Sequence, residues 1–317
     1  MSVATGEALA GIVAVSAAMR EVLESAAKLA DARSPVLLEG ESGTGKDLLA
    51  HYLHYRGARR DGPFIKVHCP SIPAELLESE LFGHERGAFT DARQTKAGKI
   101  EMAAAGTLFF DQIQELTPAL QAKLLRVVEE RRFERLGGTR TLEVDVRFIA
   151  SAGADLRQAV AARAFREDLY HRLRVLPLTL PPLRSRREDI LPLASHFLAR
   201  ERERGTTAAH GFEPDTAAAL KGYLWPGNVR ELRAVVERAA LYSPGAEVPT
   251  RALPEQVLEQ PETLWAGRER RPTLKDVEQA YIRYVLEHEA GNQTRAAAAL
   301  GISRKALWEK RKRYGIR

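Results

Sequence analysis

A glycine-rich stretch between residues 40 and 47 has the residue types that bind phosphate. It consists of Gly40, Glu41, Ser42, Gly43, Thr44, Gly45, Lys46 and Asp47. The apolar run 35–38 precedes it and the helix-like run 48–53 follows it. In a strand–loop–helix context, backbone N–H groups turn toward phosphate oxygens and the lysine reaches the outer phosphates. The sequence therefore predicts a nucleotide site, against the alternative of an ordinary glycine-rich turn.

Acidic residues downstream indicate where a metal ion would be held. The apolar run 107–110 ends in Asp111. In a sheet beside a phosphate-binding loop, such an aspartate usually organises Mg²⁺. Asp47 stands where a serine or threonine hydroxyl usually holds the same ion, so other groups must contribute. The sequence therefore predicts a nucleotide bound with Mg²⁺, with Asp111 as the metal ligand.

The residue after Asp111 bears on hydrolysis. A second acid normally follows to orient the attacking water, but this chain has Gln112. An amide can align a water molecule and cannot accept its proton. Glu115, one turn further on, is the candidate for a substitute base. Nucleotide binding is therefore expected, whereas hydrolysis is left open.

These residues lie in a pattern of alternating strands and helices that runs to about residue 180. Apolar runs predict the strands, and apolar residues at helical spacing predict the helices. The expected strands are 35–39, 64–69, 107–111, 144–150 and 174–180, and the expected helices include 47–55, 74–81 and 118–130. This alternation predicts an α/β fold with a parallel sheet covered by helices.

The positive charge of the chain is concentrated at its C-terminal end. The net charge is +6, and residues 291–317 hold eight Arg or Lys against one acidic residue, Glu309, which gives +7 locally. The rest of the chain is therefore close to neutral. Such a local cluster favours a polyanion as the partner.

Residues 291–305 have the spacing of a helix-turn-helix that binds double-stranded DNA. Small residues at 296–299 let two helices cross closely, Gly301 allows a sharp turn, and Ser303 can cap the next helix. The basic helix 304–314 would then lie in the major groove, and the alternative is a solvated basic helix. The residues expected at the DNA are Arg295, Ser303, Arg304, Lys305, Lys310, Arg311 and Arg313.

The composition also indicates the cellular compartment in which the protein works. The single cysteine, Cys69, excludes an intrachain disulfide and suits a reducing environment. No apolar run approaches the roughly 20 residues that span a bilayer, and the N-terminus lacks the pattern of a signal peptide. We therefore expect a cytoplasmic protein without a membrane partner.

Three further motifs carry a family resemblance. They are ELFGHERGAFTDA at 80–92, FREDLYHRL at 165–173 and WPGNVREL at 225–232. With the loop at 40–47, they resemble the AAA+ domain of bacterial enhancer-binding proteins, the activators of sigma-54 RNA polymerase. The C-terminal segment resembles the Fis-type helix-turn-helix of the same family. The resemblance covers nearly all of residues 11–317.

The resemblance implies an oligomer that binds ATP. Such proteins form rings, commonly hexamers, with ATP between subunits, and a dimer is the expected resting state. Arg166 and Arg172 match the arginines that reach a neighbour's ATP, and Arg230 matches the sensor arginine of the helical lid. A guanidinium suits these roles because it stays charged and contacts phosphate oxygens in pairs. The alternative for each is a surface salt bridge. Asn228 is interpreted as a helix cap.

The resemblance also assigns a sigma-54 contact loop. It comprises Gly87, Ala88, Phe89, Thr90, Asp91 and Ala92, which correspond to the family's GAFTGA motif. Phe89 and Thr90 are the residues expected to touch sigma-54. Asp91 replaces a glycine, which adds a charge and removes a flexible position.

The expected domain boundaries follow from these assignments. The α/β nucleotide-binding subdomain covers 1–180, and helices at 190–204, 214–223 and 229–242 form a lid over 181–245. Prolines and weak periodicity predict a linker over 246–272, before a helix-turn-helix domain over 273–317. No receiver domain is evident before residue 11, so we expect a separate partner, or further chain, to supply the input.

Several departures from the family pattern leave two further functions open. His68 replaces an asparagine beside the acid pair, and Ala152 and Gly153 replace the sensor Thr-Asn. With Gln112, these changes remove groups that sense and cleave the γ-phosphate. One alternative is therefore a regulator that binds ATP without hydrolysing it, or a co-subunit of an active paralogue. A DNA-processing AAA+ ATPase is the other, and the sigma-54 contact loop argues against it.

Overall fold

The chain forms two compact units in the computed structural model. Residues 12–90, 92–153, 156–258, 273–288 and 293–315 are described. The first unit comprises Met1–Ala217 and Leu224–Ala252, and the second comprises Ala218–Tyr223 and Leu253–Arg317. The expected α/β subdomain and most of the expected lid thus fall within one unit.

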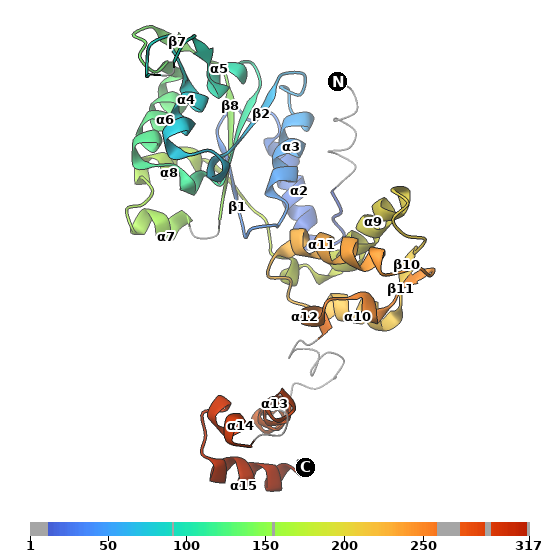
Figure 1. Cartoon of the computed structure of the whole chain (residues 1–317). Helices are drawn as coiled ribbons and strands as arrows, with labels where there is room; N and C mark the ends of the chain where they lie inside the picture. The colour runs from blue at the N-terminus through green and yellow to red at the C-terminus, as the bar shows by residue number, and fades with distance from the viewer. Residues whose placement is uncertain (1–11, 91, 154–155, 259–272, 289–292, 316–317) are drawn as a thin grey trace. The chain divides into compact units, whose positions relative to one another are not determined.

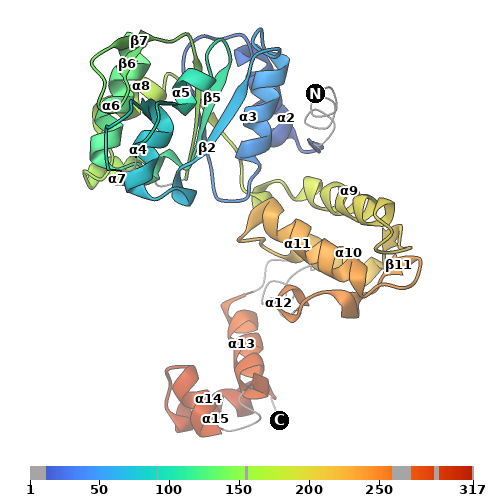
Figure 2. The same cartoon turned by 45° about the horizontal axis from the view of Figure 1, so that its top comes forward.

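A five-stranded parallel sheet forms the centre of the first unit (Figures 1 and 2). In spatial order its strands are β2 (Phe64–His68), β5 (Thr107–Asp111), β8 (Arg147–Ala152), β1 (Val36–Glu39) and β9 (Leu176–Thr179). The parallel register pairs His68 with Asp111 and Glu39 with Ala152. Parallel strands end at the same edge of the sheet, so this order gathers their last residues into one place.

Helices cover both faces of the sheet, as the alternation of strands and helices predicts. On one face lie α2 (Ala17–Leu29) and α3 (Lys46–Arg56), and on the other lie α4 (Ala74–Phe82), α6 (Pro118–Glu130) and α8 (Glu167–Leu173) (Figure 1). Successive strand residues supply the two cores. Phe109 packs toward α3 and Phe110 toward α4 and α6, and both are fully buried.

Short elements complete this part of the first unit. They are η1 (Cys69–Ser71), β3 (Gly83–His84), β4 (Lys96–Ala97), α5 (Lys99–Met102), η2 (Ile113–Glu115), β6 (Arg132–Glu134), β7 (Thr141–Glu143) and α7 (Leu156–Ala161). Two of the pairs, β3–β4 and β6–β7, are antiparallel. The strand expected at 144–150 instead spans Arg147–Ala152. Val144 N donates to Arg131 O, so Val144 extends the β6–β7 pairing.

The expected helical lid follows the sheet. Its elements are η3 (Leu183–Ser185), η4 (Arg187–Asp189), α9 (Ile190–Glu203), β10 (Gly211–Phe212), α10 (Pro214–Gly222) and α11 (Asn228–Leu241). The apolar face of α11 is buried at Leu232, Val236 and Ala239. The described residues include no helix that is both long and apolar enough to cross a membrane.

The stretch expected to be a linker carries more structure than its prolines suggest. It contains β11 (Glu247–Val248), η5 (Thr250–Ala252) and α12 (Glu255–Leu258). Val248 pairs with Phe212 of β10 and is fully buried, as is Val257. The burial of these apolar residues corrects the linker assignment for 247–258, and 259–272 lie outside the described residues.

Three helices at the C-terminal end form a small core within the second unit. They are α13 (Leu274–His288), α14 (Gln293–Ala299) and α15 (Arg304–Tyr314). Ala296 and Ala297 are buried against Ile282 and Leu307, so the small residues allow the close crossing that the sequence predicts. Gly301 turns the chain with φ of +65°, a conformation that favours glycine. Ser303 caps α15, accepting from Ala306 N at 3.1 Å.

Candidate nucleotide-binding site

The glycine-rich loop joins β1 to α3, as expected. Gly40, Gly43 and Gly45 have φ of +148°, +78° and +108°, which side-chain-bearing residues rarely adopt. At Gly43 a Cβ would stand 2.3 Å from the carbonyl oxygen of Gly227 in the lid. Glycine is therefore required there both by the backbone conformation and by the close approach of the lid.

Lys46 is buried at the first turn of α3, with its ammonium group folded against the loop. Its Nζ donates to the carbonyl oxygens of Gly40 at 2.6 Å and Glu41 at 2.9 Å. Burial lowers the pKa of Lys46 to about 8, although the carboxylate of Asp111 acts in the opposite direction. This ammonium group is placed to contact phosphate oxygens, and it titrates within an accessible pH range.

A cavity of about 450 Å³ lies between the loop and the lid within the first unit. Gly43, Thr44, Gly45, Lys46 and Asp47 line it from the loop, and Asp111 and Gln112 line it from the end of β5. The lid contributes Leu193, His196 and Phe197 from α9 and Arg230 from α11. A lining that combines apolar and aromatic groups with charged groups suits a base and its phosphates.

The lid is hydrogen-bonded directly to the loop. Asn228 Nδ2 donates to Ser42 O at 3.0 Å and to a carboxylate oxygen of Glu41 at 3.2 Å, while its Oδ1 accepts from Leu183 N. Arg230 donates to Ser42 Oγ at 2.9 Å. Asn228 is fully buried with φ of +54°, and Gly227 occupies the N-cap of α11. The interpretation of Asn228 as a helix cap is therefore wrong, because its amide links the lid to the loop.

Glu41 carries a second connection to the same region. Its carboxylate accepts from Arg184 at 2.7 Å. The Arg184 hydrogen bond, with a smaller contribution from Asn228, holds the pKa of Glu41 at about 2. Glu41 is therefore ionised at all working pH values, and it belongs to the loop–lid contact.

Asp111 lies at the carboxyl end of β5 with partners on both of its oxygens. Ser151 of β8 donates to Oδ1 at 2.7 Å, and His68 Nδ1 lies 2.9 Å from Oδ2. Burial acts to raise the pKa of Asp111, but the Ser151 hydrogen bond and the charge of Lys66 hold it below its usual value. The carboxylate is therefore ionised and engaged on each side.

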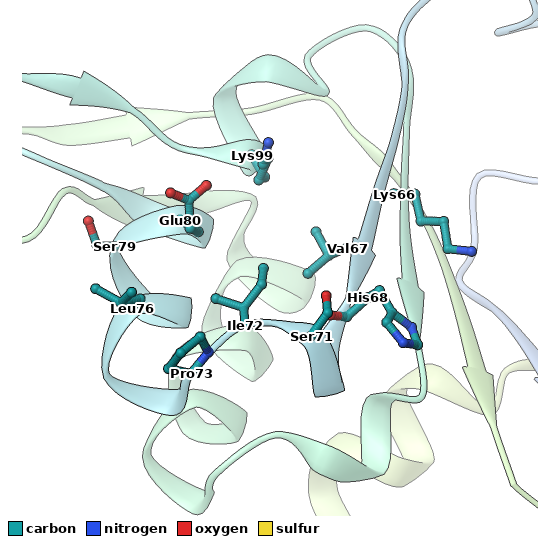
Figure 3. Close-up of a pocket in the computed structure, with 10 residues that line it drawn as sticks. All are labelled: Lys66, Val67, His68, Ser71, Ile72, Pro73, Leu76, Ser79, Glu80 and Lys99. Atoms are coloured by element: carbon teal, nitrogen blue, oxygen red, sulfur yellow. The ribbon is translucent and has the colours of Figure 1, made fainter.

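Lys66 is a site residue that the sequence reasoning missed. Its Nζ forms an ion pair with Asp47 and lies 3.4 Å from Oδ2 of Asp111. Lys66 and His68 extend from the same side of β2, opposite to Val67 (Figure 3). The period of two along a strand was the available signal, because it places residue 66 on the same face as His68. Ser151 of β8 was also missed, because its hydroxyl reaches Asp111 only through the pairing of β8 with β5.

The residues after Asp111 lack a carboxylate in the cavity. Gln112 lines it, with φ of +60° and a backbone N–H that donates to Ser151 Oγ at 3.0 Å. Glu115 is exposed and does not line the cavity, so the proposed substitute base is not brought to the site. Ala152 and Gly153 follow at the end of β8 and have no side chain that hydrogen-bonds.

The two arginines expected to reach a neighbouring subunit lie at α8, away from the cavity of their own chain. Arg166 is exposed and paired with Asp168, with contacts of 3.0 and 2.7 Å. Arg172 is exposed as well. Neither lines the cavity. The chain therefore leaves both guanidinium groups at its surface.

The loop expected to contact sigma-54 is a turn between β3 and β4. Gly87 N donates to Ala92 O at 2.8 Å, and Ala92 N donates to Phe89 O at 3.0 Å. Phe89 is 42% exposed, with its ring edge-on to His84 at 4.9 Å. Gly87 and Thr90 are exposed, whereas Asp91 lies outside the described residues. An apolar ring thus projects from a short, hydrogen-bonded turn.

The base of this loop is held by ion pairs. Arg135 of the β6–β7 hairpin contacts Glu85 at 2.9 Å and Glu101 at 2.6 Å. Ala88 touches the same hairpin, because a Cβ on Gly137 would approach it to 2.8 Å. The loop and the hairpin therefore behave as one projecting surface.

The basic residues expected at the DNA divide into two groups within the second unit. Arg295, Ser303, Arg304, Lys305 and Arg313 are exposed. Lys310 and Arg311 are half-buried, and Lys310 forms an ion pair with Glu278 of α13. Lys310 and Tyr314 both contact the Glu278 carboxylate, so this face of α15 helps to hold the domain together.

Comparisons with known proteins agree with this architecture. The profile of the Sigma-54 interaction domain matches residues 12–179, more than half of the chain. The chain belongs to the family of sigma-54-dependent transcriptional activators. The profile of the AAA+ ATPase lid domain matches 184–269, and that of the Fis-family bacterial regulatory proteins matches 273–314. This sigma-54 activator therefore carries an ATP-binding AAA+ domain and a Fis-type helix-turn-helix, which confirms the predicted family and fold.

Relatives of this sigma-54 activator cover most of its length. It is 46% identical over 312 residues to the regulatory protein AtoC of Escherichia coli, which covers 96% of this chain and 68% of AtoC. It is 50% identical over 232 residues to the Nif-specific regulatory protein of Herbaspirillum seropedicae, covering 73% of this chain and 43% of that protein. The crystal structure of NtrX from Brucella abortus in complex with ATP has a TM-score of 0.73 and 34% identity, covering 96% of this chain and 70% of NtrX.

The lowered pKa of Lys46 predicts that nucleotide affinity depends on pH. The ATP phosphates bind the protonated form of Lys46 and raise its pKa. The affinity for ATP is therefore highest well below pH 8 and falls as the pH rises through about 8. The Kd for ATP should increase about tenfold between pH 7.5 and 9, where the ATP phosphates are already ionised. Lys46→Arg, whose guanidinium stays charged, should flatten the profile in a fluorescence binding titration. A pH-independent Kd for the unmodified chain would contradict this.

Proposed function

We propose that this sigma-54 activator binds ATP between the subunits of a ring. The support is the cavity at residues 42–47, with Lys46 at its phosphate end and Arg230 of the lid beside it. Arg166 and Arg172 lie outside that cavity and are exposed at the surface, and Arg166 would exchange its ion pair with Asp168 for a neighbour's phosphates. In a ring, commonly a hexamer, each site would receive both arginines from the neighbouring subunit.

The ring is proposed to contact sigma-54 through residues 87–92. Phe89 is the observation that carries this proposal, because this turn leaves a large apolar ring 42% exposed, with its edge toward His84. Thr90 beside it is exposed and supplies a hydroxyl. The ion pairs of Arg135 hold the base of the turn, so its tip is presented to a partner.

Phe89→Ala tests the contact. We expect the affinity for purified sigma-54, measured in the presence of ATP, to fall by more than about tenfold, because a few large buried anchor residues carry most of the binding energy of an interface. ATP affinity should be unchanged. Met102→Ala is the matched control, since Met102 is an exposed apolar residue of the same unit at 50% exposure. Equal losses in the two variants would show that the loop has no special role.

The helix-turn-helix is proposed to anchor the protein on double-stranded DNA upstream of the promoter. The exposed basic residues Arg304, Lys305 and Arg313 lie on α15, which has the length and position of a recognition helix. Arg295 adds an exposed charge from α14. Phosphate contacts by these residues would supply affinity, and contacts to base edges would supply specificity.

Arg304→Ala tests the DNA contact through its salt dependence. The slope of log K against log salt concentration should become shallower by about 1, because one phosphate contact is lost. Arg60→Ala removes an exposed arginine of the first unit and should leave the slope unchanged. Fluorescence anisotropy on duplex DNA between 50 and 200 mM salt, the range of steep dependence, measures both slopes. An unchanged slope for Arg304→Ala would exclude it from the interface.

A second candidate function is a regulator that binds ATP without hydrolysing it. Gln112 is the observation that favours it, because the residue that lines the cavity after Asp111 cannot accept a proton. Glu115 is exposed outside the cavity and does not substitute for it. Steady-state ATP turnover decides between this candidate and an active ATPase.

Mg²⁺ at Asp111 is expected from the sequence, but the residues present do not fit it. One Asp111 oxygen accepts from Ser151, and the other lies near His68 and Lys66. Asp47 is paired with Lys66 as well. The proposed function therefore assigns no role to Mg²⁺.

A further inference from the structure

The ammonium group of Lys66 lies between two carboxylates at the phosphate end of the cavity. It is paired with Asp47 of α3 and stands 3.4 Å from Oδ2 of Asp111 on β5. All three residues line the same cavity as Lys46. A positive charge from the protein itself therefore occupies the place between two acidic groups where a divalent cation would otherwise be coordinated.

The surroundings of Lys66 keep it at this position. Lys66 Nζ also lies 5.7 Å from the centre of the Phe109 ring, a cation–π contact at the side of β5. The neighbouring His68 shares Oδ2 of Asp111 with it. For a divalent cation to lie between the two carboxylates, Lys66 would have to leave both of them.

The cationic side chains around the phosphate end of the cavity are also suited to a triphosphate without a metal ion. Lys46 approaches it from the loop, Lys66 from the edge strand and Arg230 from the lid, and all three line the cavity. Three cations from three different elements can contact separate phosphate oxygens of one triphosphate. Magnesium usually supplies part of this neutralisation in nucleotide sites, because it bridges the outer phosphates.

We propose that Lys66 takes the place of the divalent cation, so that this chain binds the metal-free triphosphate of a nucleotide as tightly as its magnesium complex. The inference rests on the proposed function, in which ATP occupies this cavity. Its consequence is that ATP binding, and any switching that depends on it, is insensitive to the magnesium concentration. The alternative is that Lys66 and Asp47 form an ordinary solvent-exposed ion pair, which Mg²⁺ displaces because exposed pairs are individually weak.

The test compares the Kd for ATP in excess EDTA and in excess Mg²⁺. For the unmodified chain, we expect the two Kd values to agree within about threefold. This difference is less than half of a tenfold step on a logarithmic scale. Lys66→Ala should weaken binding at least tenfold in EDTA, and Mg²⁺ should restore much of it, because the freed carboxylates can then hold the ion. Isothermal titration calorimetry reports binding without requiring hydrolysis.

Lys123→Ala is the matched control. Lys123 is an exposed lysine of α6 that forms a comparable surface pair with Glu78, away from the cavity. It should bind ATP like the unmodified chain in both buffers. Circular dichroism of each variant confirms that the fold is retained.

Three outcomes would overturn the inference. If the unmodified chain binds ATP at least about tenfold more tightly with Mg²⁺ than with EDTA, the lysine does not replace the metal, while ATP binding itself stands. If Lys66→Ala matches the unmodified chain in both buffers, Lys66 has no role at the phosphates. If ATP binds in neither buffer, the proposed nucleotide function is itself overturned, a result that the Lys46→Ala variant would then share.

Discussion

The carboxylate of Asp111 is the group on which the arrangement of the nucleotide site depends. It ends strand β5, and its partners come from the two neighbouring strands, His68 from β2 and Ser151 from β8. Because parallel strands end at one edge, the order of the sheet brings these groups together without any long loop. A partly buried carboxylate is stable only when it is hydrogen-bonded or paired, and here these contacts and Lys66 meet that requirement.

The lid adds a second constraint to the same site. Asn228 and Arg230 hydrogen-bond to Ser42, and Gly43 leaves room for the carbonyl oxygen of Gly227. The loop that would hold phosphate is therefore shared between the sheet and the lid. A ligand that displaces Arg230 from Ser42 changes the contact between them, which gives the nucleotide a direct way to act on the lid.

The sequence predicts the parts of this site that depend on local pattern. The loop 40–47, the strand ending at Asp111 and the cap at Ser303 each follow from residue types at fixed spacing. Contacts between distant segments could not be derived in this way. The role of Asn228 depends on the approach of the lid to the loop, and Lys66 meets Asp47 only because β2 and α3 lie side by side. The extent of the linker was misjudged because Val248 finds a partner in Phe212, far away in sequence.

We propose that the site binds ATP without hydrolysing it, because Gln112 and not a carboxylate follows Asp111 in the cavity. Steady-state release of phosphate from ATP, measured on the full chain at concentrations that permit assembly, tests it most directly. Lys46→Ala provides the baseline, because it removes the buried ammonium group from the phosphate end of the cavity. We expect the unmodified chain to release phosphate no faster than Lys46→Ala, although it binds ATP. Turnover clearly above that baseline would contradict it.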